Sequence, residues 1–302
     1  MPDTCSSFIF PAFTRDYRDH PGQHLPGFEE LFSGWLRAGA ASADPSLSQF
    51  KFSDPAFTGD ELRTQYITYI YSCTVAGILR NITTAPLFTA GYSMGIYAAL
   101  FDAGAIDFET GLELIRIAYH SMAHSTRGGK YGMGTVIGLS RTDLELLTGN
   151  PVSKVEIVNQ NASHSFVVSG EAAGLARLLS DARAEGALFV NNLDVTVPYH
   201  SGFLKEGAED FSRQISHLHI SSPNAPVVSL INQQLLVTPE SLRGELIMNL
   251  CHPLNWFETQ QVMINRNVTL FIECGPSEGL VKNSKFIPGN YRFSRLGSLI
   301  SR

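Results

Sequence analysis

Residues 86–101 read Pro-Leu-Phe-Thr-Ala-Gly-Tyr-Ser-Met-Gly-Ile-Tyr-Ala-Ala-Leu-Phe, and this stretch predicts a strand, a tight turn and a helix in succession. Its first part, to Ala90, is typical of a core strand, and its last part, from Ile96, is typical of a helix. Between them lies the pattern Gly-x-Ser-x-Gly, centred on Ser93. Where this pattern joins a strand to a helix, two glycines permit a sharp turn and the serine hydroxyl projects from it. Ser93 is therefore a candidate nucleophile, although the pentapeptide alone also fits a tight turn without chemistry.

Strand and helix patterns continue on both sides of this turn. An apolar run at residues 8–10 predicts a buried strand, and residues 61–81 carry apolar side chains at helical spacing. Asp107 is expected to cap a helix that runs to about His124 and ends before the Gly128-Gly129 pair. We predict a domain boundary at these glycines.

The segment from residue 130 to residue 196 predicts a second, smaller unit. Its patterns follow the order strand, helix, strand, strand, helix, strand, over residues 135–139, 141–148, 155–159, 165–169, 171–186 and 188–195. This is the order of a ferredoxin-like unit. An α/β pattern then resumes, with helices expected at 202–216, 239–250 and 256–265 and strands at 226–231 and 269–273. We therefore predict an α/β protein whose core comprises residues 1–129 and 197–302, with residues 130–196 as an inserted subdomain.

Composition narrows the classes of function. The 302 residues are 44% hydrophobic and 17% charged, which suits one large globular unit, and the net charge of −6 argues against a nucleic-acid or membrane partner. The four cysteines lack the spacing of a metal site or a disulfide scaffold. Met1 to Thr4 does not begin a signal peptide, and no apolar run has the length of a membrane span. We expect a cytoplasmic protein with free thiols.

A serine hydroxyl needs a base to take its proton, and the chain has nine histidines. His200, within Val-Pro-Tyr-His-Ser, follows the inserted unit, where a loop can direct it toward a cleft; its position alone equally fits a surface residue at a helix start. His120 and His124 share one helix face, but no third ligand accompanies them, and we predict no metal site.

Five motifs together resemble the malonyl-CoA:acyl carrier protein transacylase family. They are the elbow segment 91–100, the segment 197–201 around His200, Asn-Gln-Asn at 159–161 followed by Val-Val-Ser-Gly at 167–170, His-Pro-Leu-Asn-Trp at 252–256, and Glu-Cys-Gly-Pro at 273–276. Their order and spacing match over nearly the whole chain. The family's architecture, an α/β-hydrolase-like core that carries a ferredoxin-like subdomain, agrees with the boundary predicted above.

The resemblance implies a ping-pong acyl transfer in fatty-acid or polyketide-type synthesis. Ser93 would attack the thioester of an acyl-CoA or acyl carrier protein, and a phosphopantetheine thiol of a carrier protein would then take the acyl group, with His200 moving the proton in both steps. No bound cofactor is expected. The family also implies an oxyanion hole from the backbone N–H groups of Met94 and Phe13, and a backbone carbonyl, matched here to Asn255, that orients the histidine. The substrate pocket would include Tyr92, Ala118, Met122, Asn161 and Tyr199.

This chain departs from the family pattern at several of these positions. The usual Pro-Gly-Gln-Gly loop is Pro-Ala-Phe-Thr at residues 11–14, and Tyr92 and Ile96 replace the usual histidine and glutamate. Ala118 stands where the family has an arginine that pairs with the malonyl carboxylate, a task that suits a planar guanidinium. Arg116 lies on a different helix face and does not replace it. We therefore expect an acyl group without a distal carboxylate.

Three alternatives stay open. An acyl-carrier-protein hydrolase on the same fold would use the same serine and histidine. A non-catalytic scaffold subunit is suggested by the altered first loop, although Ser93 and His200 argue against it. A general esterase would need a base near the C-terminus, where only His252 qualifies. Because carrier proteins are acidic, a local basic surface is also expected, with candidates at Lys282, Lys285, Arg292 and Arg295.

Overall fold

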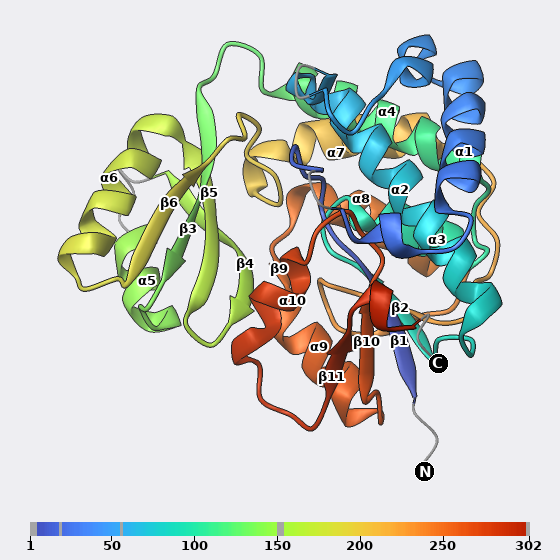
Figure 1. The fold of residues 1–302 in the computed structure, drawn as a ribbon. Helices are drawn as coiled ribbons and strands as arrows, with labels where there is room; N and C mark the ends of the chain where they lie inside the picture. Colours follow the sequence, from blue (N-terminus) through green and yellow to red (C-terminus); the bar gives the residue numbers. More distant parts are fainter. Residues whose placement is uncertain (1–4, 18–19, 55–56, 150–153, 300–302) are drawn as a thin grey trace.

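The computed structural model describes residues 5–17, 20–54, 57–149 and 154–299, which form two sheets and their covering helices (Figure 1). The larger sheet has the strand order β11-β10-β1-β2-β7-β8. Its strands are β1 (Ser6–Phe10), β2 (Phe88–Gly91), β7 (Val227–Val228), β8 (Leu235–Leu236), β10 (Leu270–Glu273) and β11 (Arg292–Ser294). All neighbours pair in parallel except β7 and β8. A parallel sheet of this kind is buried on both faces, which explains the apolar runs of its strands.

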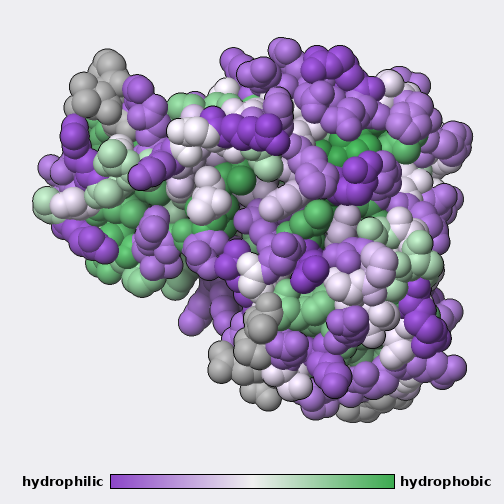
Figure 2. All heavy atoms as spheres, turned by 90° about the horizontal axis from the view of Figure 1, so that it is seen from above, coloured by the Kyte–Doolittle hydropathy of each residue, from purple (hydrophilic) through white to green (hydrophobic). Residues whose placement is uncertain are grey.

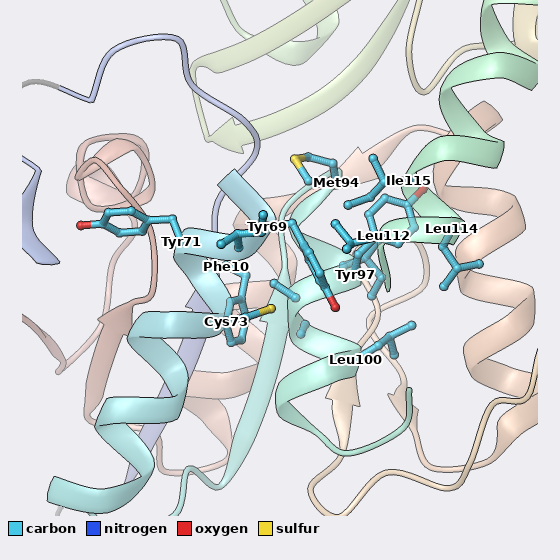
Figure 3. Close-up of a cluster of buried hydrophobic side chains, with 14 of the residues drawn as sticks. Phe10, Tyr69, Tyr71, Cys73, Met94, Tyr97, Leu100, Leu112, Leu114 and Ile115 are labelled. Atoms are coloured by element: carbon cyan, nitrogen blue, oxygen red, sulfur yellow. The ribbon is translucent and has the colours of Figure 1, made fainter. Parts of the chain in front are cut away.

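Successive side chains of the strands enter two different helical layers. Phe8 and Phe10 pack in one cluster, whereas Ile9 packs in another on the opposite face of the sheet. The helices of the first layer are α1 (Phe28–Ser42), α2 (Glu61–Ile82), α3 (Gly95–Asp102), α4 (Phe108–Ser125), α7 (Lys205–Gln214) and α8 (Pro239–Cys251). Figure 3 shows side chains of α2, α3 and α4 meeting around Tyr69 and Tyr97. The second face is covered by α9 (Trp256–Asn265) and α10 (Gly279–Asn283).

The smaller sheet has the order β6-β3-β5-β4-β9. Its elements are β3 (Tyr131–Ile137), α5 (Arg141–Thr148), β4 (Val155–Ala162), β5 (Ser165–Glu171), α6 (Ala172–Ala184), β6 (Phe189–Leu193) and β9 (Leu254–Asn255). The first four strands of this order are antiparallel neighbours, and α5 and α6 cover one face. The other face carries Met133 and Val167 toward Tyr199 of the core segment. One face of the inserted unit thus becomes a wall beside the core.

The sequence-based elements agree well with this architecture. Helices α5 and α9 have the predicted bounds, and the ferredoxin-like order of strands is confirmed. The strand expected over 226–231 shortens to β7, and the helix expected over 202–216 is divided into Gly202–Leu204, α7 and Ile215–His217. Further short 3₁₀ turns lie at Pro21–His24, Pro45–Gln49, Phe57–Gly59, Ser284–Phe286 and Leu296–Leu299.

Some elements were not predicted. Helix α1 was missed, although Phe28, Phe32 and Leu36 recur at helical spacing and all three are buried. Strand β9 was missed because two residues carry no period; it pairs in parallel with β4 and joins the core segment to the smaller sheet. The division of the chain at residues 129/130 and 196/197 therefore stays a proposal.

Polar side chains cover most of the face shown in Figure 2, and hydrophobic ones surface in separate patches on both lobes. Within the described ranges, no helix has both the length and the apolar character needed to cross a bilayer. Met1 to Thr4, on which the absence of a signal peptide was argued, lie outside the described residues.

Candidate active site

Ser93 lies in a sharp turn between β2 and α3, at the carboxyl edge of the parallel sheet. It has the left-handed φ of 56°, which is uncommon for a residue with a side chain and is often found at functional sites. A Cβ on Gly91 would lie 2.3 Å from the backbone of Ile96, and a Cβ on Gly95 would lie 2.1 Å from the carbonyl oxygen of Phe10. Both glycines are therefore required by close backbone contacts. The turn, predicted from the sequence, exposes the Ser93 hydroxyl at the start of a helix.

His200 meets this hydroxyl from the segment that follows the inserted unit. Its Nε2 lies 2.8 Å from Oγ of Ser93, across 107 residues of sequence. His200 also has a left-handed φ, 63°, and only 5% of its surface is exposed. Its backbone N–H donates to the carbonyl of Leu250 at 2.9 Å, which fixes the loop against the end of α8. The two segments that the sequence singled out are thus brought together.

The second imidazole nitrogen fixes the tautomer. Nδ1 of His200 lies 2.5 Å from the backbone carbonyl oxygen of Asn249. Because a carbonyl can only accept, Nδ1 carries the proton and Nε2 presents a lone pair to the serine hydroxyl. Burial lowers the pKa of His200 to about 4, and the bond to the Asn249 carbonyl opposes this shift only in part. The imidazole is therefore a neutral acceptor near neutral pH.

The assignment of the orienting carbonyl to Asn255 was wrong. The Asn255 carbonyl accepts from the Thr259 hydroxyl at 2.8 Å, and its side chain caps α9 by accepting from the N–H of Glu258. Asn249 takes the role because it lies in the last turn of α8, where carbonyls lack intrahelical donors. Its partner within the helix would be residue 253, which is proline and has no N–H. That spacing was a usable signal in the sequence.

Two cavities meet at the Ser93–His200 pair. The larger, of about 470 Å³, is lined by Ala12, Phe13, Thr14, Arg15, Tyr92, Met133, Asn159, Val167, Leu193, Asp194, Val195 and Tyr199. The smaller, of about 30 Å³, is lined by Phe13, Gln65, Met94, Tyr97, Ala118, Tyr119, Tyr199, Asn249 and Leu250. The larger cavity lies between the core and the inner face of the smaller sheet, and the smaller one extends into the core. The serine can therefore be reached from a broad cleft and has a confined space behind it.

Four of the five predicted pocket residues lie at or next to these cavities. Tyr92 lines the larger, Ala118 the smaller and Tyr199 both. Asn161 accepts a hydrogen bond from the Tyr92 hydroxyl at 2.9 Å and so supports the wall. Met122 was wrongly placed in the pocket: it is fully buried, and a Cβ on Gly207 of α7 would lie 2.7 Å from its terminal methyl group. The α4–α7 contact holds this side chain away from the serine.

Met94 and Phe13 line the smaller cavity together with Ser93, and the role of their backbone N–H groups as oxyanion donors stays a proposal. In the altered first loop, the N–H of Thr14 donates to the Thr68 hydroxyl at 3.4 Å, and that hydroxyl lies 2.7 Å from the Tyr17 hydroxyl. These side chains of the core hold the loop where the family's glycines are absent.

The sequence reasoning missed Gln65, Tyr97, Tyr119 and Arg15 as lining residues. The first three come from α2, α3 and α4 and make the smaller cavity more polar than the substitutions alone suggested. Among the described lining residues of both cavities, Arg15 is the single Lys or Arg, and its Nη1 lies 2.6 Å from the carboxylate of Asp194. In the described part of the chain, no group of three or more His, Cys, Asp or Glu side chains is arranged to hold a metal ion.

This chain is similar to curated proteins named malonyl CoA-acyl carrier protein transacylase. It is 29% identical over 275 residues to the malonyl CoA-acyl carrier protein transacylase of Bacillus subtilis, covering 86% of this chain and 83% of the relative. It is 29% identical over 237 residues to that of a Synechocystis strain, covering 78% of each chain. No family model matches the chain.

Solved structures agree. The malonyl CoA-acyl carrier protein transacylase of Coxiella burnetii has a TM-score of 0.88 at 25% identity, covering 99% of this chain and 96% of its own. An acyl-carrier-protein S-malonyltransferase of Burkholderia pseudomallei has a TM-score of 0.87 at 26% identity and 99% coverage of both chains. The chain therefore shares fold and sequence with one group of enzymes over nearly its full length.

We predict that the rate at which Ser93 is acylated by an acyl-CoA stays nearly constant from pH 8 down to about pH 5 and falls with a midpoint near pH 4, where the buried imidazole is protonated. Quenched-flow sampling with intact-mass detection measures this rate, and circular dichroism at each pH checks that the fold persists. A midpoint near 6.5, the ordinary pKa of histidine, would contradict a desolvated base.

We also predict that His200→Ala lowers the rate of Ser93 acylation by about 10²–10⁴-fold, because the serine then lacks its general base.

Proposed function

We propose that this homologue of the malonyl-CoA:acyl carrier protein transacylases is a serine S-acyltransferase that moves a short acyl group from CoA to the phosphopantetheine thiol of an acyl carrier protein, in fatty-acid or polyketide-type synthesis. The observation that carries the proposal is the 2.8 Å contact between Ser93 Oγ and a neutral, oriented His200 Nε2 where two cavities meet. In an acyl-serine mechanism, such a pair supplies the nucleophile and its general base.

In the first half-reaction, Ser93 Oγ attacks the thioester carbonyl as Nε2 of His200 takes its proton. The N–H groups of Met94 and Phe13 would stabilise the oxyanion, which then collapses with cleavage of the C–S bond. His200 returns the proton to the departing CoA thiolate. In the second half-reaction, the carrier's thiol gives its proton to His200 and attacks the acyl-serine ester, and Ser93 leaves with that proton. Since His200 returns to its neutral form after each half-reaction, one base serves both.

The two cavities suit different parts of such a substrate. The larger cleft is open to solvent and has room for an extended pantetheine arm. The smaller cavity lies deeper, beside Ala118, and suits an acyl group of a few atoms. Neither part requires a bound cofactor, since CoA and the carrier's phosphopantetheine enter as substrates.

The identity of the acyl group is a finer question. The names of the relatives give malonyl as the transferred group, and taken alone they indicate malonyl here as well. The lining of the smaller cavity favours an uncharged group, because its described residues include no Lys or Arg and Ala118 stands at the family's arginine position. Arg116, considered as a substitute, pairs with Glu113 at 2.6 Å outside the cavity. We keep an acyl group without a distal carboxylate as our proposal.

A hydrolase on the same fold is the second candidate, and one observation favours it. Nδ2 of Asn249 is buried without a hydrogen-bond partner among the described residues, and Asn249 lines the smaller cavity beside Ser93 and His200. A cavity of about 30 Å³ has room for a water molecule, and an amide donor can hold one. The scaffold alternative is disfavoured by the intact Ser93–His200 pair. An esterase that uses His252 has no support, since its Nδ1 lies 3.3 Å from Cys251 Sγ rather than near the serine.

The fate of the acyl-serine separates transfer from hydrolysis. We expect the isolated acyl-Ser93 adduct to persist without a carrier and to disappear on addition of a holo acyl carrier protein, with the acyl group found on the carrier's thiol. Intact-mass spectra of both proteins over time measure this. Rapid decay that a carrier neither speeds nor intercepts would establish the hydrolase instead. The apo carrier, which lacks the thiol, is the matched control.

Ala118→Arg tests the acyl preference. A guanidinium at this position should raise Ser93 acylation by malonyl-CoA, relative to the similarly sized acetoacetyl-CoA, by about tenfold or more, because it can pair with the free carboxylate. Ala118→Leu adds bulk without charge and should slow both donors. The proposal of an uncharged group fails if the wild type already prefers malonyl-CoA, and loss of that preference in Arg15→Gln would assign the carboxylate to the cleft arginine.

A further inference from the structure

A carboxylate lies directly behind the wall of the smaller cavity. Glu61 is the first residue of α2, and its Oε1 accepts a hydrogen bond from the Tyr199 hydroxyl at 2.8 Å and one from Nε2 of Gln65 at 3.3 Å. Tyr199 and Gln65 both line the cavity that holds Ser93 and His200. The charge of Glu61 is therefore one side chain away from the space assigned to the acyl group.

Within the described part of the chain, no cation pairs with this charge. The nearest arginines along the chain and on α4 are engaged elsewhere: Arg63 with Asp44 at 3.1 Å and Arg116 with Glu113. Its hydrogen-bond donors are neutral groups. Burial raises the pKa of Tyr199, and the Glu61 charge raises it further, as expected for a negative group beside a buried hydroxyl.

Local structure explains why a carboxylate is stable there. Glu61 lies in the first turn of α2 behind the N-cap Asp60, where the helix dipole favours negative charge. The donated hydrogen bonds add to this. A site that binds malonyl has a positive charge close to the acyl group. Here the smaller cavity instead has a methyl group at position 118 and a negative charge behind Tyr199.

We infer that Glu61 is a specificity-determining residue that selects against acyl groups ending in a carboxylate and so favours uncharged ones. The inference rests on the proposed function, because it concerns the group that becomes attached to Ser93. Alanine at position 118 only removes an attraction for the malonyl carboxylate. The inference adds that Glu61 repels this carboxylate. Two like charges separated by one side chain in a partly buried site should change relative rates by about tenfold or more.

Glu61→Gln tests the inference. Glutamine keeps the length of the side chain and an oxygen that can accept from Tyr199, but it removes the charge. Second-order rates of Ser93 acylation are measured by intact mass with malonyl-CoA and with acetoacetyl-CoA, which has similar size and no carboxylate. The expected result is an increase of about tenfold in the malonyl-to-acetoacetyl ratio, with the acetoacetyl rate nearly unchanged. Glu109→Gln, which removes an exposed charge from the first turn of α4, should leave the ratio as it is.

The outcomes separate the possible roles. If Glu61 only holds Tyr199 in place, the variant slows both donors equally and the ratio stays constant, which overturns the inference while Ser93 is still acylated. If no donor acylates Ser93 in the wild type or in either variant, the proposed function itself fails and the inference fails with it. Thermal unfolding of Glu61→Gln and Glu109→Gln, expected to be alike, shows whether a lost rate reflects a lost fold.

Discussion

The site depends on the hydrogen bond between Ser93 Oγ and Nε2 of His200. Its partners come from segments that are far apart in sequence, and both residues adopt left-handed backbone angles that cost free energy on their own. The surrounding structure stabilises this geometry. Two close-packed glycines set the serine turn, and a bond to the end of α8 sets the histidine loop.

Desolvation makes the histidine a neutral base but leaves a buried polar ring that needs partners. The α8 terminus supplies one where the Pro253 ring removes an N–H donor, which frees the Asn249 carbonyl for Nδ1. Ser93 supplies the other. Because both ring nitrogens are satisfied in one tautomer, the histidine holds its proton on the side away from the serine. A helix end thus performs the orienting role for which Ser-His-Asp sites use a carboxylate.

The sequence was sufficient to predict those parts of the fold and the site that depend on local periodicity and short motifs. The strand–turn–helix around Ser93, the order of the inserted unit and helices α5 and α9 all follow from short-range patterns. It failed where a role belongs to the backbone or arises from tertiary contact. Asn249 acts through its carbonyl, which its side chain does not indicate, and Met122 packs against α7 instead of lining the pocket. Arg15 comes to line the larger cavity, and Glu61 comes to lie behind the wall of the smaller one, only through folding of distant segments, which no spacing along the chain reveals.

We propose that Ser93 is the nucleophile that carries the acyl group. The most direct measurement is the intact mass of the protein after incubation with a panel of acyl-CoA donors, followed by peptide mapping of any adduct. We expect a single acyl group on Ser93 and none in Ser93→Ala. An adduct on one of the cysteines, or one that survives Ser93→Ala at the wild-type level, would contradict it.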